Sequence, residues 1–338
     1  MSQQSKVRWG ILGAARINQQ LMPAIIAASN SELTAIASRR PGAAEAILEQ
    51  YAPGIENVRL YNDPAELLKD PDIQAVYIPL ANQEHAKWAL RAIEHGKHVL
   101  CEKPMALSIS DIEAIQAATE KHQVCVMEGF MYRFHPQHQR IQEIISSGAI
   151  GDVRSVRTCS AYPMQPARLY RIDRRIALGG GAMWDIGCYA IHTARLHFGD
   201  TPAKAVTALA KHNEYDADIS CSGIIDFGDG KYAQFSFGFE HARRAEYEII
   251  GTKGGIKCHN VWAKQDEMPV ISWTSNTREE HTEQLDAANH FTLEVEHFCD
   301  CVLNKRPLRL SLQDAKDNCA LILGALESVH QGRTIQLD

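Results

Sequence analysis

Short apolar runs alternate with helical patterns along the first third of the chain. The runs are rich in Val, Ile, Leu and Ala, and they cover residues 7–12, 33–37, 58–61, 75–78, 98–101 and 124–127. After the fifth run, Ser108 and Asp111 form a pattern that typically opens a helix. Strands separated by helices over this length predict an α/β fold class with a parallel, doubly wound sheet.

The pattern changes after about residue 125. Residues 205–258 are nearly all strand-like, and Asp229-Gly230 is a two-residue hairpin signal. Helical spacing is found in the segments 137–147, 184–198, 293–303 and 312–329. Long antiparallel strands flanked by helices predict an α+β domain built on one open sheet. We therefore expect two domains, residues 1–125 and 126–338.

Composition narrows the class of protein. A chain of 338 residues with 45% hydrophobic and 22% charged residues has enough apolar material for two ordinary cores. A net charge of −6 without a basic block argues against nucleic-acid binding. We expect no membrane span and no signal peptide, because long apolar runs are missing. The nine cysteines form no Cys-x-x-Cys pair, which is typical of reduced thiols in the cytoplasm.

A candidate phosphate-binding turn follows the first strand. Small residues there let the backbone approach a pyrophosphate, and the next helix directs its N-terminus at the charge. The residues of this turn are Gly13, Ala14, Ala15, Arg16 and Ile17. Only Gly13 matches the glycine pattern of dinucleotide-binding turns, since Ala15 and Asn18 stand at the other glycine positions. A plain strand-turn-helix connection is the alternative.

The second strand ends in Ser38-Arg39-Arg40. A site for NAD would place a carboxylate near this point to bind the ribose hydroxyls. A hydroxyl and two guanidiniums suit a 2′-phosphate instead, because Arg presents a planar fork of donors. This favours NADP(H) over NAD as cofactor. An exposed basic turn is the alternative reading.

Glu102-Lys103-Pro104 follows the fifth strand directly. Ligands of open α/β sheets bind outside the carboxyl ends of the strands, so Lys103 is expected over a ligand. Pro104 stiffens the turn, and the sequence leaves its peptide bond open as cis or trans. A solvated lysine in a connecting turn is the alternative.

A glycine turn, Gly179-Gly180-Gly181, precedes a predicted helix. On that helix Asp185, Tyr189 and His192 are spaced at i, i+4 and i+7, so they are expected on one face. The alternative is an ordinary solvated helix face.

Taken in order, the Gly13 turn, the Glu102–Pro104 motif and the segment 179–189 resemble the glucose-fructose oxidoreductase/inositol dehydrogenase (Gfo/Idh/MocA) family over essentially the whole chain. Residues 127–136 and 185–189 are similar to the branch with NADP-dependent D-xylose dehydrogenases and dimeric dihydrodiol dehydrogenases. Many members carry His where this chain has Tyr189, and Tyr is typical of that branch.

The resemblance implies a Rossmann domain followed by an α/β domain whose open sheet often forms a dimer face. We therefore expect a homodimer or homotetramer through the C-terminal sheet. It also implies that Lys103 and Tyr189 flank the nicotinamide and the reacting carbon. Further residues implied at the cofactor are Leu80, Asn82, His85 and Glu102, and those implied at the substrate are Asp185, His192 and Tyr162. For His85, a helix-capping role is an equal alternative.

The substrate itself stays open, because residues 170–175, expected to face it, do not align cleanly with the family. The leading hypothesis is an NADP-dependent oxidoreductase for a sugar or polyol carbon. The alternatives are a trans-dihydrodiol dehydrogenase, a sugar-nucleotide ketoreductase, and a cofactor-sensing binding protein without turnover. The His and Glu groups at 135–138 and 294–297 stand alone, so we expect no metal.

The chemistry needs a group that exchanges the proton of the substrate hydroxyl. A free tyrosine has a pKa of about 10 and is a poor base, but a nearby ammonium lowers that pKa. Lys103 is the expected ammonium and Tyr189 the expected general base or acid, with Asp185 orienting Lys103 or a substrate hydroxyl. The reverse assignment, Lys103 as base and Tyr189 as donor, also remains open.

Overall fold

The computed structural model describes residues 5–172, 175–277 and 279–337. The chain folds into two compact units. The first contains Met1–Phe134 and Asn289–Lys316, and the second contains His135–Ala288 and Asp317–Asp338.

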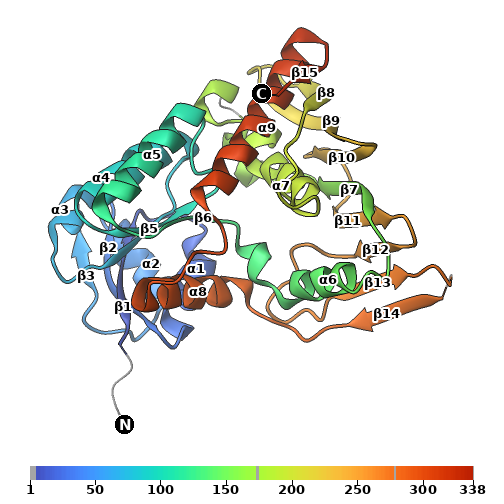
Figure 1. The fold of residues 1–338 in the computed structure, drawn as a ribbon. Coiled ribbons are helices and arrows are strands. Elements are labelled where there is room, and N and C mark those ends of the chain that lie inside the picture. Colours follow the sequence, from blue (N-terminus) through green and yellow to red (C-terminus); the bar gives the residue numbers. More distant parts are fainter. Residues whose placement is uncertain (1–4, 173–174, 278, 338) are drawn as a thin grey trace. The chain divides into compact units, whose positions relative to one another are not determined.

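A six-stranded parallel sheet forms the first unit (Figure 1). Its strands are β1 (Val7–Leu12), β2 (Ser31–Ala37), β3 (Arg59–Tyr61), β4 (Ala75–Ile78), β5 (His98–Glu102) and β6 (Val126–Gly129). Their order is β3-β2-β1-β4-β5-β6, so the direction of strand succession reverses between β1 and β4. Such a reversal is the topological switch point at which doubly wound sheets bind ligands. The predicted α/β class and parallel sheet are confirmed.

Helices connect these strands. They are α1 (Asn18–Ala27), α2 (Ala43–Tyr51), α3 (Pro64–Lys69), α4 (His85–Glu94), preceded by η1 (Asn82–Glu84), and α5 (Ile109–His122), with η2 (Met131–Phe134) after β6. The predicted cap of α5 forms, because the Ser108 hydroxyl accepts a hydrogen bond from the Asp111 backbone N–H at 3.1 Å. It stabilises the helix by satisfying a donor that the helix itself leaves unpaired.

The boundary expected after residue 125 differs from the division of the chain into compact units. Strand β6 pairs in parallel with β5, with Val126 opposite Val99, so it extends the first sheet. Helix α8 (His290–Asn304) also belongs to the first unit. The Phe298 ring on α8 lies 5.2 Å from the fully buried Trp9 ring of β1, centroid to centroid. Both differences arise from contacts between residues far apart in the sequence.

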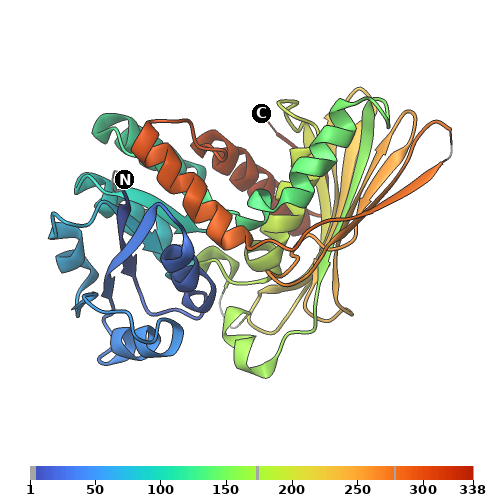
Figure 2. The same cartoon turned by 90° about the horizontal axis from the view of Figure 1, so that it is seen from below.

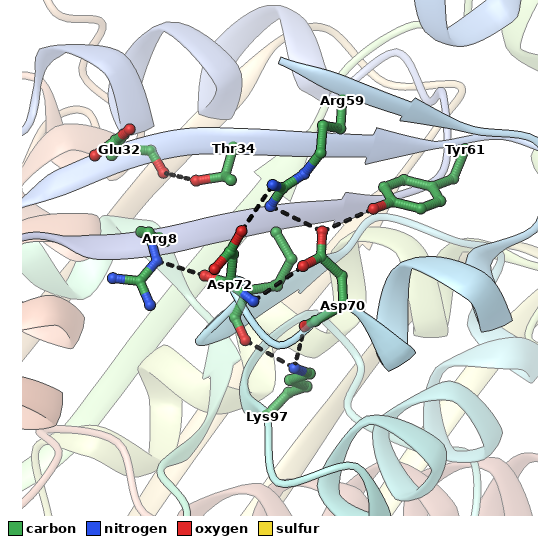
Figure 3. Close-up of polar contacts among 9 residues, drawn as sticks. Arg8, Glu32, Thr34, Arg59, Tyr61, Asp70, Asp72 and Lys97 are labelled. Carbon is green, nitrogen blue, oxygen red and sulfur yellow. Dashed lines mark hydrogen bonds and ion pairs between the residues drawn. The ribbon is translucent and has the colours of Figure 1, made fainter. Parts of the chain in front are cut away.

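A partly buried polar cluster joins three connections of the first unit (Figure 3). The Lys97 ammonium, 6% exposed, donates to the carbonyl oxygens of Asp70 and Ile73 at 2.7 and 2.8 Å. The Asp70 carboxylate accepts a hydrogen bond from the Tyr61 hydroxyl at 2.7 Å and pairs with Arg59 at 2.8 Å. The cluster therefore fixes the loop between α3 and β4 against β3 and β5.

The second unit is built on a nine-stranded sheet with the order β14-β13-β12-β11-β7-β10-β9-β8-β15. The strands are β7 (Val153–Ala161), β8 (Ala205–His212), β9 (Asp218–Gly228), β10 (Lys231–Gly238), β11 (Arg244–Gly251), β12 (Gly255–Cys258), β13 (Val270–Thr274), β14 (Glu280–Gln284) and β15 (Ile335–Gln336). Among the described strands of this sheet, only β10 and β7 pair in parallel. The predicted large, mainly antiparallel sheet is confirmed, and β13 to β15 lie beyond the predicted strand region.

Two helices of the second unit, α6 (Pro136–Ser146) and α7 (Cys188–Leu196), cover one face of this sheet (Figure 2). The Thr158 hydroxyl on β7 donates to the Ala190 carbonyl of α7 at 3.1 Å. The opposite face exposes large apolar side chains, with Leu209 at 75% and Ile224 at 50%. Helix α9 (Leu312–Gln331) runs from the first unit into the second.

None of the helices in the described ranges is both long and apolar enough to cross a membrane.

Candidate active site

The glycine turn lies at the end of β1, beside the switch point. Gly13 has a φ of +130°, and a Cβ at this position would lie 2.8 Å from Leu80 Cδ2. The Asn18 side chain, fully buried, donates from Nδ2 to the Gly13 carbonyl at 2.9 Å. Asn18 therefore holds the turn from a position where the dinucleotide pattern has glycine. The structure brings Gly13 and Leu80 together.

The N-terminus of α1 is suited to an anion. The Ile17 side chain at its N-cap position forms no capping hydrogen bond, and the first turn contains no acidic residue. The helix dipole and the backbone N–H groups there favour a negative charge. Ala14, Ala15 and Ile17 are half-buried around this turn, and Arg16 is exposed.

The end of β2 is tied to the same turn. Ser38 is 5% exposed, and its hydroxyl accepts a hydrogen bond from the Arg40 backbone N–H at 3.2 Å. The Arg40 guanidinium donates to the Ala14 carbonyl. Arg39 extends into solvent as an exposed side chain. The structure thus brings the Ser38–Arg40 turn beside the Gly13–Ala14 turn.

Strand β5 delivers Glu102 and Lys103 to the same edge of the sheet. The Lys103–Pro104 peptide bond, which the sequence left open, is cis. The Tyr77 hydroxyl of β4 donates to Glu102 at 2.7 Å. Burial and the negative charge of Glu102 raise the pKa of Tyr77 well above its ordinary value, so the phenol stays protonated as the donor.

A second carboxylate side chain lies near Glu102. Glu294 of α8 is 2% exposed, and burial together with the charge of Glu102 raises its pKa well above the usual range. Within the described part of the chain, no group of three His, Cys, Asp or Glu side chains is arranged to hold a metal.

Two further residues hold the turn after Lys103. The Met105 backbone N–H donates to the buried Glu128 carboxylate at 2.6 Å. The His85 ring lies between two carbonyl oxygens, with Nδ1 2.7 Å from that of Pro104 and Nε2 2.9 Å from that of Leu80. Glu128 and Tyr77 were missed as site residues, because only strand pairing brings them to this turn.

Burial lowers the pKa of His85, the charge of Lys103 lowers it further, and the two carbonyl contacts oppose this without reversing it. His85 does not cap α4 with its side chain, since the cap position is Glu84. Of the two expected roles, helix capping is therefore wrong. Asn82 lies one turn earlier, in η1.

The expected substrate-side helix begins irregularly. Residues Met183–Gly187 form a π-helical turn, and α7 continues from Cys188. A π-helical turn is wider than an α-helical one, so the regular i, i+4 spacing assumed for Asp185 and Tyr189 does not apply across it. Asp185, Tyr189 and His192 are 9%, 8% and 1% exposed, which excludes the solvated-face alternative. The Tyr189 ring packs edge-on against Trp262, centroids 5.3 Å apart.

Asp185 lies in a charged cluster of the second unit. Its carboxylate forms an ion pair with Arg171 and lies 3.5 Å from the Tyr162 hydroxyl. Burial and the Asp185 charge raise the pKa of Tyr162. Burial alone would lower the pKa of Arg171, but its attraction to Asp185 and hydrogen bonding outweigh this and raise it. Tyr162 and Asp185, both predicted, are brought together.

Arg171 was not predicted as the partner of Asp185. It belongs to the segment 170–175, of which residues 173 and 174 lie outside the described residues. Lys103 belongs to the first unit and Tyr189 to the second, so their joint action stays a prediction.

The first unit is a doubly wound sheet with a glycine turn at its switch point. The second unit has a buried Asp and Tyr beside another glycine turn. Together these features define a two-domain, dinucleotide-dependent class of oxidoreductase. The chain belongs to the Gfo/Idh/MocA family. Residues 7–130 match the family described as an oxidoreductase family with an NAD-binding Rossmann fold, and residues 138–257 match the GFO/IDH/MocA C-terminal domain. The resemblance inferred from the motifs is confirmed.

Three comparisons illustrate the similarity. A D-xylose 1-dehydrogenase (NADP(+)) from Haloferax volcanii is 31% identical, over 98% of this chain and 99% of that protein. A trans-1,2-dihydrobenzene-1,2-diol dehydrogenase from Xenopus laevis is 30% identical, over 95% and 98%. The crystal structure of a 3-ketoreductase from Actinomadura kijaniata, in complex with NADP and TDP-benzene, has a TM-score of 0.87 and 30% identity, over 96% of this chain and 98% of that one.

Proposed function

We propose that this protein is an NADP(H)-dependent oxidoreductase that transfers a hydride between nicotinamide C4 and a CH–OH or C=O carbon of a sugar or polyol. The observation that carries the cofactor choice is the Ser38–Arg40 turn, which has no carboxylate and is hydrogen-bonded through Arg40 to the glycine turn. Three donor side chains at this position suit a 2′-phosphate. The NADP-dependent D-xylose relative supports the same choice.

The proposed cofactor residues form three groups, according to the part of NADP that each group contacts. The proposed residues are Gly13, Ala14, Ala15, Arg16 and Ile17 at the pyrophosphate, Ser38, Arg39 and Arg40 at the 2′-phosphate, and Leu80, Asn82, His85, Glu102 and Lys103 towards the nicotinamide. The uncapped N-terminus of α1 and the left-handed Gly13 turn fit such a group.

Bound NADP supplies one chemistry, the donation or acceptance of a hydride at C4. The protein supplies the proton transfer. During oxidation Tyr189 takes the proton of the substrate hydroxyl, and during reduction it returns a proton to the carbonyl oxygen. Lys103 provides the positive charge that favours the tyrosinate. The reverse assignment, with Lys103 as base, is an outcome of the test below.

Substrate contacts are proposed for Asp185, Tyr162 and His192 in the second unit. The pairing of Asp185 with Arg171 modifies the earlier expectation that Asp185 orients Lys103. A carboxylate held by a guanidinium is oriented to accept a hydrogen bond from a substrate hydroxyl, and this is its proposed role. His192 lies within α7 and is buried, so its proposed contact with the substrate is made by a ring that is closed off from solvent.

A sugar-nucleotide ketoreductase is the second candidate. Arg168 and Arg171 lie beside Tyr162 and Asp185, with the Arg168 guanidinium 5.8 Å from the Tyr162 ring centroid. Guanidiniums at this position would suit a diphosphate. The similarity to a 3-ketoreductase crystallised with TDP-benzene supports the alternative.

The test is a hydride-transfer assay with NADPH and NADP⁺ over aldoses, polyols, trans-dihydrodiols and dTDP-linked ketosugars. Turnover of an aldose or polyol with preference for NADP supports the proposal, whereas turnover of dTDP-linked ketosugars alone supports the second candidate. Binding of NADPH without turnover of any substrate supports a cofactor sensor.

Two variants then assign the proton carrier. In Tyr189→Phe we expect kcat to fall about a hundredfold or more, since general acid–base catalysis contributes about that much. Lys103→Met should lower kcat and shift the pH profile. Tyr51→Phe, at the end of α2 and outside the residues proposed at the site, is the control. Turnover close to wild type in Tyr189→Phe makes Lys103 the base.

We also propose that two copies pair through the uncovered face of the nine-stranded sheet. Leu209, Ile224 and Tyr232 are exposed there, at 75%, 50% and 39%, and a groove of about 460 Å³ is hollowed beside the first two. Apolar surface of this kind is typical of protein interfaces. Light scattering should give a dimer or tetramer for wild type and a smaller species for Ile224→Glu. A cytoplasmic location is proposed because all nine cysteines are thiols.

A further inference from the structure

A buried carboxylate lies behind the second glycine turn. Asp218 is the first residue of β9, and it is 1% exposed. Its Oδ2 accepts a hydrogen bond from the Met183 backbone N–H at 2.6 Å, and its carboxylate is also hydrogen-bonded to the backbone of Ala182. Both donors belong to the start of the helix that carries Asp185 and Tyr189.

The same carboxylate occupies the space beside Gly181. Gly181 has a φ of +95°, and a Cβ built there would lie 2.1 Å from Asp218 Oδ1. Only glycine fits this conformation together with the carboxylate. The close approach of Asp218 explains why the third residue of this turn is glycine. The sequence alone did not indicate that Asp218 is its neighbour.

Burial of the Asp218 carboxylate at this position is unfavourable in free energy. Among the described residues, Asp218 Oδ1 has no hydrogen-bond partner, so half of the acid group is buried without one. Burial raises the pKa of Asp218 to about 7, against the backbone hydrogen bonds that lower it. A buried acid with one unpaired oxygen is destabilising in itself. The hydrogen bonds that Asp218 accepts from the backbone at the start of the helix offset this destabilisation.

We propose that Asp218 is a positioning residue for the substrate-side helix. By accepting hydrogen bonds from the backbone at residues 182 and 183, it fixes the start of the π-helical turn. Asp185 follows two residues after Met183, and Tyr189 is the second residue of α7, so their placement depends on this anchor. The inference rests on the proposed function, in which Asp185 and Tyr189 act on the substrate.

The test compares Asp218→Asn with wild type and with Asp226→Asn. Asp226 lies on the same strand, is exposed, and its carboxylate accepts from the Gly228 backbone N–H in the hairpin turn. An amide at position 218 retains one acceptor oxygen but cannot carry the negative charge that strengthens the hydrogen bonds from the backbone of residues 182 and 183. Because a displacement of about 1 Å can cost about a hundredfold in rate, we expect kcat to fall about tenfold to a hundredfold. The Kd for NADP⁺ should stay within about twofold, since the proposed cofactor residues lie in the other unit.

Hydrogen exchange gives a readout that does not depend on activity. We expect faster exchange of the backbone amides at residues 181–187 in Asp218→Asn, with the rest of the nine-stranded sheet and the Asp226→Asn protein unchanged. Gly181→Ala disturbs the same contact from the other side and should give the same pattern, so it replaces Asp218→Asn if that variant does not fold.

Wild-type kcat in both Asp218→Asn and Gly181→Ala would overturn the inference, as would unchanged exchange at residues 181–187. Loss of cooperative unfolding in both variants would also overturn it, because the role would then be structural. If wild type itself turns over no substrate of the panel, the proposed function fails, and the exchange measurement still decides whether Asp218 anchors the helix.

Discussion

The His85 imidazole links the turn after β4 to the turn after β5. Its Nε2 lies 2.9 Å from the Leu80 carbonyl, and its Nδ1 lies 2.7 Å from the Pro104 carbonyl. The ring is 1% exposed, so neither contact is exchanged for water. The turns that carry two proposed cofactor residues, Leu80 and Lys103, are therefore held at a fixed separation by one side chain.

Replacing His85 should loosen this link. In His85→Ala we expect NADP⁺ to bind about tenfold more weakly, because losing one or two buried hydrogen bonds is worth about 1–2 kcal/mol. Isothermal titration measures this directly. His95→Ala, at the exposed end of the same helix, is the control, since its ring is hydrogen-bonded within that helix, to the Arg91 carbonyl. Equal affinity in all three proteins would contradict the prediction.

Acid should destabilise the first unit partly through His85. Burial lowers its pKa below the ordinary value of 6.5, so on acidification the unfolded chain takes up the proton first. The contribution of His85 to stability is therefore present above about pH 6.5 and is lost as the pH falls through its folded-state pKa. His98 and His297 are shifted in the same direction by burial. Urea unfolding from pH 7.5 to 5 should show a smaller loss of stability in His85→Gln than in wild type, and an identical slope would refute the assignment.

The ion pair between Arg171 and Asp185 should show strong coupling. In Arg171→Met the carboxylate, with its side chain 11% exposed, loses its cation. We expect a loss of about 1–3 kcal/mol in the free energy of unfolding, at the lower end because part of the arginine is solvated. Asp185→Asn combined with Arg171→Met should cost less than the sum of the single changes. A double-mutant cycle from urea unfolding measures this, and strict additivity would mean that the two groups do not interact.

Lys97 should matter for stability and not for chemistry. Its ammonium is buried and donates to the carbonyls of Asp70 and Ile73 (Figure 3). Lys97→Met leaves both carbonyls without this donor, so we expect a loss of about 2 kcal/mol. Lys69→Met, which removes an exposed ion pair with Glu66, should cost much less, because solvent screens that pair. Thermal unfolding measures both changes. Comparable losses of stability in the two variants would show that the buried contacts of Lys97 stabilise the fold no more than an exposed ion pair does.

Much of the site could be read locally. The Gly13 turn, the Ser38–Arg40 turn and Glu102-Lys103 each follow a strand directly, and strands of a parallel sheet end at one edge. Their meeting was therefore predictable once the strands were recognised. The partners that hold them were not, because Tyr77, His85 and Glu128 reach this edge only through the order in which the strands pair.

By itself, the sequence determined the α/β class, the six parallel strands, the mainly antiparallel second sheet and the family, because periodicity and short motifs are local properties of the chain. Tertiary structure alone decided that residues 289–316 complete the first unit, that Arg171 pairs with Asp185, and that Asp218 requires Gly181 to be glycine. Each of these depends on groups far apart along the chain, or on a side-chain orientation, and hydrophobic patterning carries no information about either.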